Sequence, residues 1–197
     1  MKIIMLRHGL TQWNVLGKYQ GQTDIGLNNN GRIQAHKLAL FLAEQEQAVE
    51  AIYCSDLSRC RETAAIIGKA LALTPILEPR FREIHFGNWE GLTYTEVTEK
   101  YPQEQSDWLN RTLEVKVSGG ESIPAVLTRC LAGIRDISKQ HQGTVIVVSH
   151  GGFIKILLNH LGAPTGMWEA HLHSGSMTIL ECEGDAIIPI QIGLTIE

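Results

Sequence analysis

Two short apolar runs in the chain each end in a histidine followed by glycine, and this repeated pattern restricts the available folds most strongly. The first is MKIIMLRHG at residues 1–9, and the second is TVIVVSHGG at residues 144–152. Continuous apolar and β-branched runs of this length are typical of parallel strands covered on both faces. Ligands bind outside the carboxyl ends of such strands. We therefore expect Arg7, His8 and His150 to meet at one edge of a sheet.

Strand and helix patterns alternate along the rest of the chain. Apolar runs predict further strands at 51–54 and 75–77, and a closing hairpin at 177–182 and 186–192. Helical spacing predicts helices at 28–46, 55–71, 94–100, 103–111, 123–137 and 153–161. Asn28 is expected to cap the first of these, and Ser55 or Asp56 the second. This order predicts an α/β fold, a three-layer sandwich with a mostly parallel central sheet and helices on both faces. We expect one domain over residues 1–197.

The composition limits the partners and the compartment. The 197 residues carry a net charge of −4 without a basic tail or cluster, so we expect no nucleic-acid partner. None of the four cysteines lies in a C-x-x-C pair, which argues against a zinc ribbon or a thioredoxin-like motif. The apolar run at 3–6 is too short for a signal peptide, and no stretch approaches the roughly 20 apolar residues of a membrane span. We expect a cytoplasmic protein with no membrane partner, as a monomer or a homodimer.

An arginine at the start of a helix adds to the predicted cationic site. In CSDLSRCRETA, Arg59 falls in the first helical turn, off the apolar face. Helix N-termini attract anions, and a guanidinium there offers a fork that suits phosphate. Arg59 alone could equally be a solvated surface residue, but with Arg7, His8 and His150 it predicts a compact phosphate pocket. Spacing does not decide whether Arg61 also reaches the ligand.

The common phosphate chemistries lack their motifs in this chain. There is no G-x-x-x-x-G-K-[ST] loop, and no D-x-D pair follows a strand. A cysteine-nucleophile loop needs five residues between its cysteine and its arginine (C-x5-R). Arg59 follows Cys54 with one residue too few between them, and Arg61 follows it with one too many. His171 and His173 could be a metal pair, but no carboxylate cluster accompanies them, so we interpret them as structural or rim residues. We expect no metal and no cofactor.

A histidine nucleophile remains as the explanation of the pocket. Neutral imidazole can attack phosphorus through one nitrogen while a hydrogen bond holds the other. Neighbouring arginines keep the ring neutral and stabilise the charge on the transferring phosphoryl oxygens. Such a site performs phosphoryl transfer by positioning and electrostatics.

The leaving alkoxide needs a proton, and three glutamates are candidates for supplying it. Glu83 lies in RFREIHFGNWEG, where aromatic neighbours could provide an apolar wall. A carboxylic acid stays protonated near neutral pH only with partial burial or negative neighbours. Glu83 could instead be a loop residue in a salt bridge with Arg82. Spacing alone does not choose Glu83 over Glu90 or over Glu121 of the GGES sequence.

These motifs together resemble the histidine phosphatase superfamily, which has the phosphoglycerate-mutase-like fold. The matching pieces are LRHGLTQWN, YQGQTDIGLNNNGRIQA, CSDLSRCRETA, FREIHFGNWEG, GGES and VVSHGG, in the family's order. The resemblance implies that His8 is the phosphorylated nucleophile and Glu83 the proton donor. It also implies phosphoryl or substrate binding by Arg7, Asn14, Gln20, Gly21, Arg59, His150 and the backbone N–H of Gly151. Leu10 departs from the family, which usually has glutamate or glutamine there, and puts the polarity of the pocket rim in doubt.

The branch of the family is suggested by the length of the interval between Glu83 and Glu121. Mutases of this family carry longer insertions there, so the short interval favours a phosphatase that uses water as acceptor. FGNWEGLTY followed by GGES resembles α-ribazole phosphatases, which serve cobalamin biosynthesis, and related broad-specificity phosphatases. We expect a small phosphorylated metabolite as substrate and a lid over it at 84–115. The alternatives are a mutase, a non-catalytic binder of phosphorylated ligands, and a metallohydrolase that uses His171 and His173.

Overall fold

A computed structural model describes residues 1–45, 48–111, 113–163, 167–168 and 171–196 of the chain. The described strands form one six-stranded sheet in the order β3-β2-β4-β1-β5-β6. They are β1 (Lys2–Arg7), β2 (Val49–Cys54), β3 (Ile76–Leu77), β4 (Thr144–Ser149), β5 (Met177–Glu183) and β6 (Ala186–Leu194). The first four strands in the sheet are parallel, and the β5–β6 hairpin is antiparallel. The predicted α/β class with a mostly parallel sheet is confirmed.

Strands β1 and β4 are parallel neighbours whose last residues are in register. Arg7 at the end of β1 pairs with Ser149 at the end of β4. The N–H of His8 then donates to the carbonyl of Ser149 at 3.0 Å. This register brings His8 and His150 out of the sheet side by side, as the sequence predicted.

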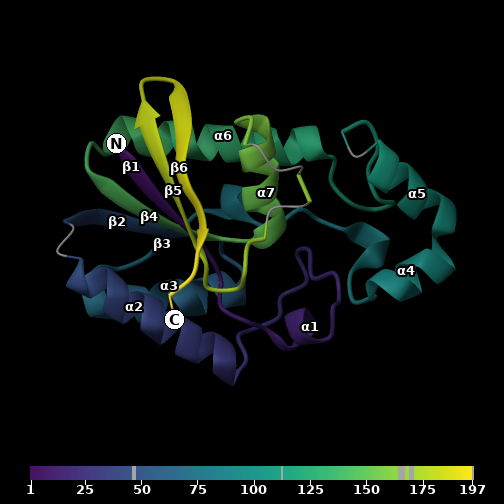
Figure 1. Ribbon diagram of the computed structural model, residues 1–197, viewed down its shortest axis with the longest axis horizontal. Helices are drawn as coiled ribbons and strands as arrows, with labels where there is room; N and C mark the ends of the chain where they lie inside the picture. The colour runs from purple at the N-terminus through teal and green to yellow at the C-terminus, as the bar shows by residue number, and fades with distance from the viewer. Residues whose placement is uncertain (46–47, 112, 164–166, 169–170, 197) are drawn as a thin grey trace.

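Helices cover both faces of the sheet, which confirms the three layers (Figure 1). On one face lie α2 (Asn29–Glu44) and α3 (Ser58–Leu71), and on the other lie α6 (Ile123–Gln140) and α7 (Gly151–His160). Alternate residues of β1 face opposite ways, so Ile4 belongs to the core with Leu38 while Ile3 belongs to the core with Ile134. No helix within the described ranges has the length and apolar character needed to cross a bilayer.

The segment predicted as a lid contains η2 (Gly87–Trp89), α4 (Tyr94–Lys100) and α5 (Pro102–Asn110). Figure 1 shows α4 and α5 beyond the sheet, at the same end of the molecule as α1 (Gln12–Val15). Trp89 and Trp108 are buried, with ring centroids 6.0 Å apart. Trp89 also donates from Nε1 to Glu104 at 2.7 Å. Both tryptophans therefore serve packing, whereas Tyr94 is exposed.

The predicted N-terminus of α3 was wrong. The helix begins at Ser58, and its capping position, Leu57, has no side-chain acceptor. The carboxylate of Asp24 takes that role from a distant loop, since it accepts from the N–H and the hydroxyl of Ser58, both at 2.7 Å. Asn28 does cap α2, accepting from Gly31 at 2.8 Å. The end predicted for that helix, Glu46, lies outside the described residues.

Candidate active site

His8 is a buried, neutral imidazole with one free nitrogen. Its side chain lies just past the end of β1, and the residue is 2% exposed. Nδ1 is 2.7 Å from the carbonyl oxygen of Gly9, which can only accept, so Nδ1 carries the proton and Nε2 the lone pair. Burial, with Arg59 and Arg7 nearby, lowers the pKa of His8 well below the usual 6.5. This state of the ring suits a nucleophile near neutral pH.

His150 lies against His8 and is also neutral. The two ring centroids are 5.2 Å apart at an interplanar angle of 64°. Nδ1 of His150 accepts from Nε of Arg59 at 3.2 Å, so its Nε2 donates to the hydroxyl of Ser55 at 2.9 Å. Burial first, and then the charge of Arg59, lower the pKa of His150 well below its usual value. A second, uncharged imidazole therefore lies beside the first at the ends of the strands.

Arg59 is fully buried in the first turn of α3 and is fixed by three acceptors. Besides His150, these are the carbonyl oxygens of Gly21, at 2.6 Å, and Thr23, at 2.9 Å. Gly21 has a φ of 50°, and a Cβ there would lie 1.9 Å from a carboxylate oxygen of Glu90. Only glycine fits that position, which explains how the 21–23 loop can hold the guanidinium.

Arg7 carries an unsatisfied donor into the same cluster. Its Nη1 donates to the carbonyl of Leu172, while its buried Nε has no hydrogen-bond partner among the described residues. A Cβ on Gly151 would lie 3.1 Å from that Nε, so glycine allows the close approach. A buried guanidinium donor without an acceptor is costly unless a ligand supplies one. Arg7 and Arg59 thus bring two guanidinium groups close to His8.

Glu83 reaches this cluster at the N-terminus of α7. Its carboxyl oxygens accept from the N–H groups of Gly152, at 2.9 Å, Phe153, at 2.7 Å, and Ile84, at 3.0 Å. The alternative considered for Glu83, a salt bridge to Arg82, is absent among the described contacts, because Arg82 pairs with Asp56 at 2.5 Å.

The other two glutamates are held elsewhere. Glu90 accepts from the N–H groups of Gln22, Thr23 and Phe86 at 2.9–3.0 Å. Glu121 pairs with Arg129 at 3.0 Å. Of the three candidates for the acid, Glu83 is thus the one whose carboxyl lies at the N-terminus of α7, the helix that follows His150.

Two predicted binding residues are joined by a buried threonine that the sequence analysis missed. The hydroxyl of Thr11 lies 3.1 Å from Oδ1 of Asn14 and 2.8 Å from Oε1 of Gln20. The side-chain oxygens of both amides therefore face Thr11, and their NH2 groups are directed elsewhere. Leu10 instead lines a surface hollow that Ile33 also lines.

Neither additional arginine extends into the cluster. Arg61 donates to the hydroxyl of Ser58 at 3.3 Å, and Arg82 is engaged by Asp56. In the described part of the chain, no group of three or more His, Cys, Asp or Glu side chains could hold a metal ion, so His171 and His173 have no further ligands there.

The similarity of this chain to a known family extends over nearly its whole length. Residues 3–192 match the histidine phosphatase superfamily (branch 1). The chain belongs to this superfamily. The resemblance seen in the sequence motifs is therefore confirmed, and the chain is a histidine phosphatase-type enzyme that acts on small phosphorylated metabolites.

Three relatives illustrate the range of the superfamily. Phosphoserine phosphatase 1 of Hydrogenobacter thermophilus is 38% identical over 151 residues, which make up 76% of this chain and 71% of the relative. A mycobacterial glucosyl-3-phosphoglycerate phosphatase in complex with VO3 has a TM-score of 0.86 and 29% identity, covering 98% of this chain and 99% of that one. The α-ribazole phosphatase of Shigella flexneri has a TM-score of 0.85 and 26% identity, with coverage of 98% and 96%.

Proposed function

We propose that this chain is a metal-independent phosphomonoesterase that works through a phosphohistidine on His8. The observation that carries the proposal is the state of His8: a buried, neutral ring whose Nδ1 proton is held by Gly9, leaving Nε2 as the nucleophilic atom. The unsatisfied Nε of Arg7 beside it supports an anionic ligand at the same place. We expect no cofactor to be required.

In the first step, Nε2 of His8 attacks phosphorus and the bond to the alkoxide oxygen breaks. Arg7 and Arg59 bind the phosphoryl oxygens, with Asn14 and the N–H of Gly151 as further donors. His150 joins them when its Nε2–H turns from the hydroxyl of Ser55 to the phosphate. Glu83 gives its proton to the leaving oxygen, so the product is a neutral alcohol.

In the second step, water attacks the phosphohistidine. Glu83, now a carboxylate, takes a proton from that water as its oxygen bonds to phosphorus and the N–P bond breaks. Inorganic phosphate leaves, and His8 returns to its neutral form. Because water and not a second phosphorylated molecule is the acceptor, this cycle is that of a phosphatase and not of a mutase.

The substrate we propose is a small alkyl phosphomonoester. It binds under the segment 84–115, which acts as a lid, and Gln20 and Gly21 lie at the pocket edge. The lid belongs to a single domain that spans residues 1–197. The sequence motifs favour α-ribazole 5′-phosphate. The 38% identity to a phosphoserine phosphatase favours phosphoserine. The TM-score with the glucosyl-3-phosphoglycerate phosphatase, 0.86, is nearly the same as that with the α-ribazole phosphatase, 0.85. A panel of these three esters, with 3-phosphoglycerate added, ranks them by kcat/KM.

The first test is phosphate release from p-nitrophenyl phosphate in excess EDTA, with the wild type beside His8→Ala. We expect turnover by the wild type that survives the chelator, and loss of at least about 1000-fold in the variant. Turnover that EDTA abolishes would support the metallohydrolase instead. Transfer to a second phosphorylated molecule without release of phosphate would support the mutase. Binding of phosphate without any turnover would support the non-catalytic binder.

A further inference from the structure

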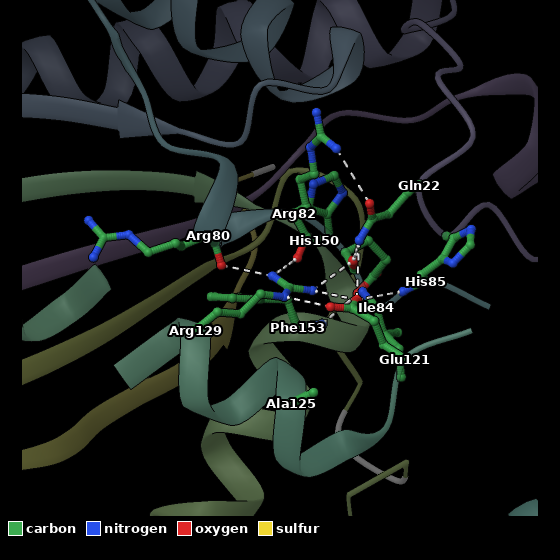
Figure 2. A network of polar contacts seen from close by, with 12 residues as sticks. Gln22, Arg80, Arg82, Ile84, His85, Glu121, Ala125, Arg129, His150 and Phe153 are labelled. Atoms are coloured by element: carbon green, nitrogen blue, oxygen red, sulfur yellow. Dashed lines mark hydrogen bonds and ion pairs between the residues drawn. The ribbon is translucent and has the colours of Figure 1, made fainter. Parts of the chain in front are cut away.

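Arg129 on α6 donates to the backbone of the segment that carries Glu83. Nη1 of Arg129 lies 2.7 Å from the carbonyl oxygen of Arg80 and 2.6 Å from that of Arg82 (Figure 2). Nη2 of Arg129 lies 2.9 Å from the carbonyl oxygen of Glu83. One guanidinium thus fixes three carbonyls within four consecutive residues. The side chain is 17% exposed, so these bonds are largely shielded from water.

Glu121 completes the coordination of this guanidinium. Its two carboxylate oxygens accept from Nε and Nη2 of Arg129, both at 3.0 Å. All five N–H donors of the guanidinium are therefore satisfied by two carboxylate oxygens and three carbonyls. Oε2 of Glu121 also accepts from the N–H of His85 at 2.9 Å. The pair binds the backbone on both sides of Glu83 and leaves Arg129 with no donor for a substrate.

Gln22 connects the pair to the loop that holds Arg59. Its Nε2 donates at 3.1 Å both to the carbonyl of Glu83 and to Oε2 of Glu121. The residues on either side of Gln22 are those whose carbonyls fix Arg59. The segment of the acid and the loop behind the phosphate-binding arginine therefore share one hydrogen-bonded network.

Arg129 also contacts the residue that binds the carboxyl of Glu83. Its Cζ lies 5.8 Å from the ring centroid of Phe153, and the N–H of Phe153 donates to Oε1 of Glu83. Arg129 thus binds the backbone of Glu83 directly and contacts Phe153, which binds the carboxyl of Glu83. Arg129 makes no described bond to the carboxyl itself, so it acts on Glu83 only by fixing its surroundings.

We infer that the Glu121–Arg129 pair positions Glu83 for proton transfer to the leaving group. The inference rests on the proposed function, since it assigns a support to the acid of that reaction. Displacement of a general acid by about 1 Å costs on the order of 100-fold in rate. Lysine has three donors and no planar fork, so it cannot replace the five bonds of the arginine.

The test uses Arg129→Lys, Arg129→Gln and Glu121→Gln with two kinds of substrate. The ratio kcat/KM reports the first chemical step, in which the alcohol leaves. An alkyl phosphate such as glycerol phosphate needs the proton of Glu83, whereas p-nitrophenolate leaves without it. We expect losses of about 100-fold for the alkyl ester and of less than about fivefold for p-nitrophenyl phosphate. Inhibition by vanadate should change little, because Arg7 and Arg59 remain.

Arg135→Gln is the matched control, because it removes an arginine from the same helix without touching this network. It should leave both kcat/KM values at the wild-type level. Equal losses of kcat/KM for the two esters, or no loss for either, would overturn the inference. The proposed function would still stand in that case if the wild type is active without a metal. An inactive wild type would remove the proposed function itself. Thermal unfolding identifies any variant that does not fold; Glu121→Gln, which conserves shape, then decides the outcome.

Discussion

The carboxyl group of Glu83 lies so close to Gly152 that a methyl group on this glycine would be 2.7 Å from Oε1. The N–H of the same glycine donates to Oε2 at 2.9 Å. The contact places the proposed acid against the first turn of the helix that follows His150. Gly152 is therefore needed both as a donor and for its lack of a side chain.

Gly152→Ala should reduce both activity and stability. The added Cβ pushes the carboxyl of Glu83 away from the leaving group, so we expect kcat/KM for an alkyl phosphate to fall about 100-fold. The displaced carboxyl also loses the N–H groups of Gly152 and Phe153, so we expect the free energy of unfolding to fall by about 1 kcal/mol. Steady-state kinetics and urea unfolding measure the two quantities.

Gly143→Ala is the control for this prediction. Its Cβ would lie 2.4 Å from a carboxylate oxygen of Glu50, so it creates a similar conflict with a glutamate away from the site. We expect wild-type kinetics for this variant. An active Gly152→Ala enzyme would show that Glu83 need not occupy its observed place.

Arg59→Lys should weaken phosphate binding for every substrate alike. Lysine keeps the buried positive charge but cannot bond to Gly21, Thr23 and His150 together while facing a phosphoryl group. We expect kcat/KM to fall about 100-fold or more for alkyl and nitrophenyl esters equally, with a matching loss of vanadate affinity. Arg61→Lys, two residues along and bound to Ser58, should have no such effect. A loss confined to one ester would contradict this role.

The two buried histidines make stability depend on pH. The pKa values of His8 and His150 are lowered by burial and by Arg59, so the folded protein stays neutral there while the unfolded chain takes up protons below about pH 6.5. Their contribution is fully present above that pH and is lost as the pH falls, with a slope of at most about 1.4 kcal/mol per pH unit for each ring. Urea unfolding between pH 7 and pH 5 measures the slope.

His8→Gln removes one of the two titrating rings and should reduce that slope. His36→Gln is the control, since His36 is exposed on α2. A slope unchanged by His8→Gln would contradict a lowered pKa for His8. The same lowering predicts that kcat/KM does not decline between pH 7.5 and 6.5 through protonation of the nucleophile.

Asp24 stabilises α3 from outside the helix, and its removal should be measurable. Asp24→Ala leaves the N–H of Ser58 without its acceptor, so we expect a loss of about 1 kcal/mol in the free energy of unfolding. Asp24→Asn keeps a side-chain oxygen and should lose less. Equal stability of Asp24→Ala and the wild type would contradict the capping role.

Local patterns in the sequence predicted the parts of the fold and site that depend on neighbours along the chain. Apolar runs located β1 and β4, and the polar residues after them became the centre of the cluster. Helical spacing placed Arg59 in the first turn of α3. The choice of Glu83 over Glu90 came from the family motifs, because spacing alone gave no reason to prefer it.

Contacts between distant segments could not be predicted in this way. Asp24 caps Ser58 across 34 positions, so the nearer Ser55 and Asp56 were chosen wrongly. Arg129 gave no signal, since its carbonyl partners lie 46–49 residues earlier in a loop. Thr11 reaches Gln20 only because the chain folds back, whereas its contact with Asn14 is a local capping box at the start of α1.

Capture of the phosphorylated intermediate tests the nucleophilic role of His8. The enzyme is mixed with radiolabelled substrate in EDTA, denatured within the first turnover, and digested to locate the label. A phosphohistidine on His8 predicts an acid-labile, alkali-stable phosphate on the peptide that contains His8, and no label in His8→Ala. Rapid turnover by the wild type with no trapped label, or a label on any other residue, would contradict it.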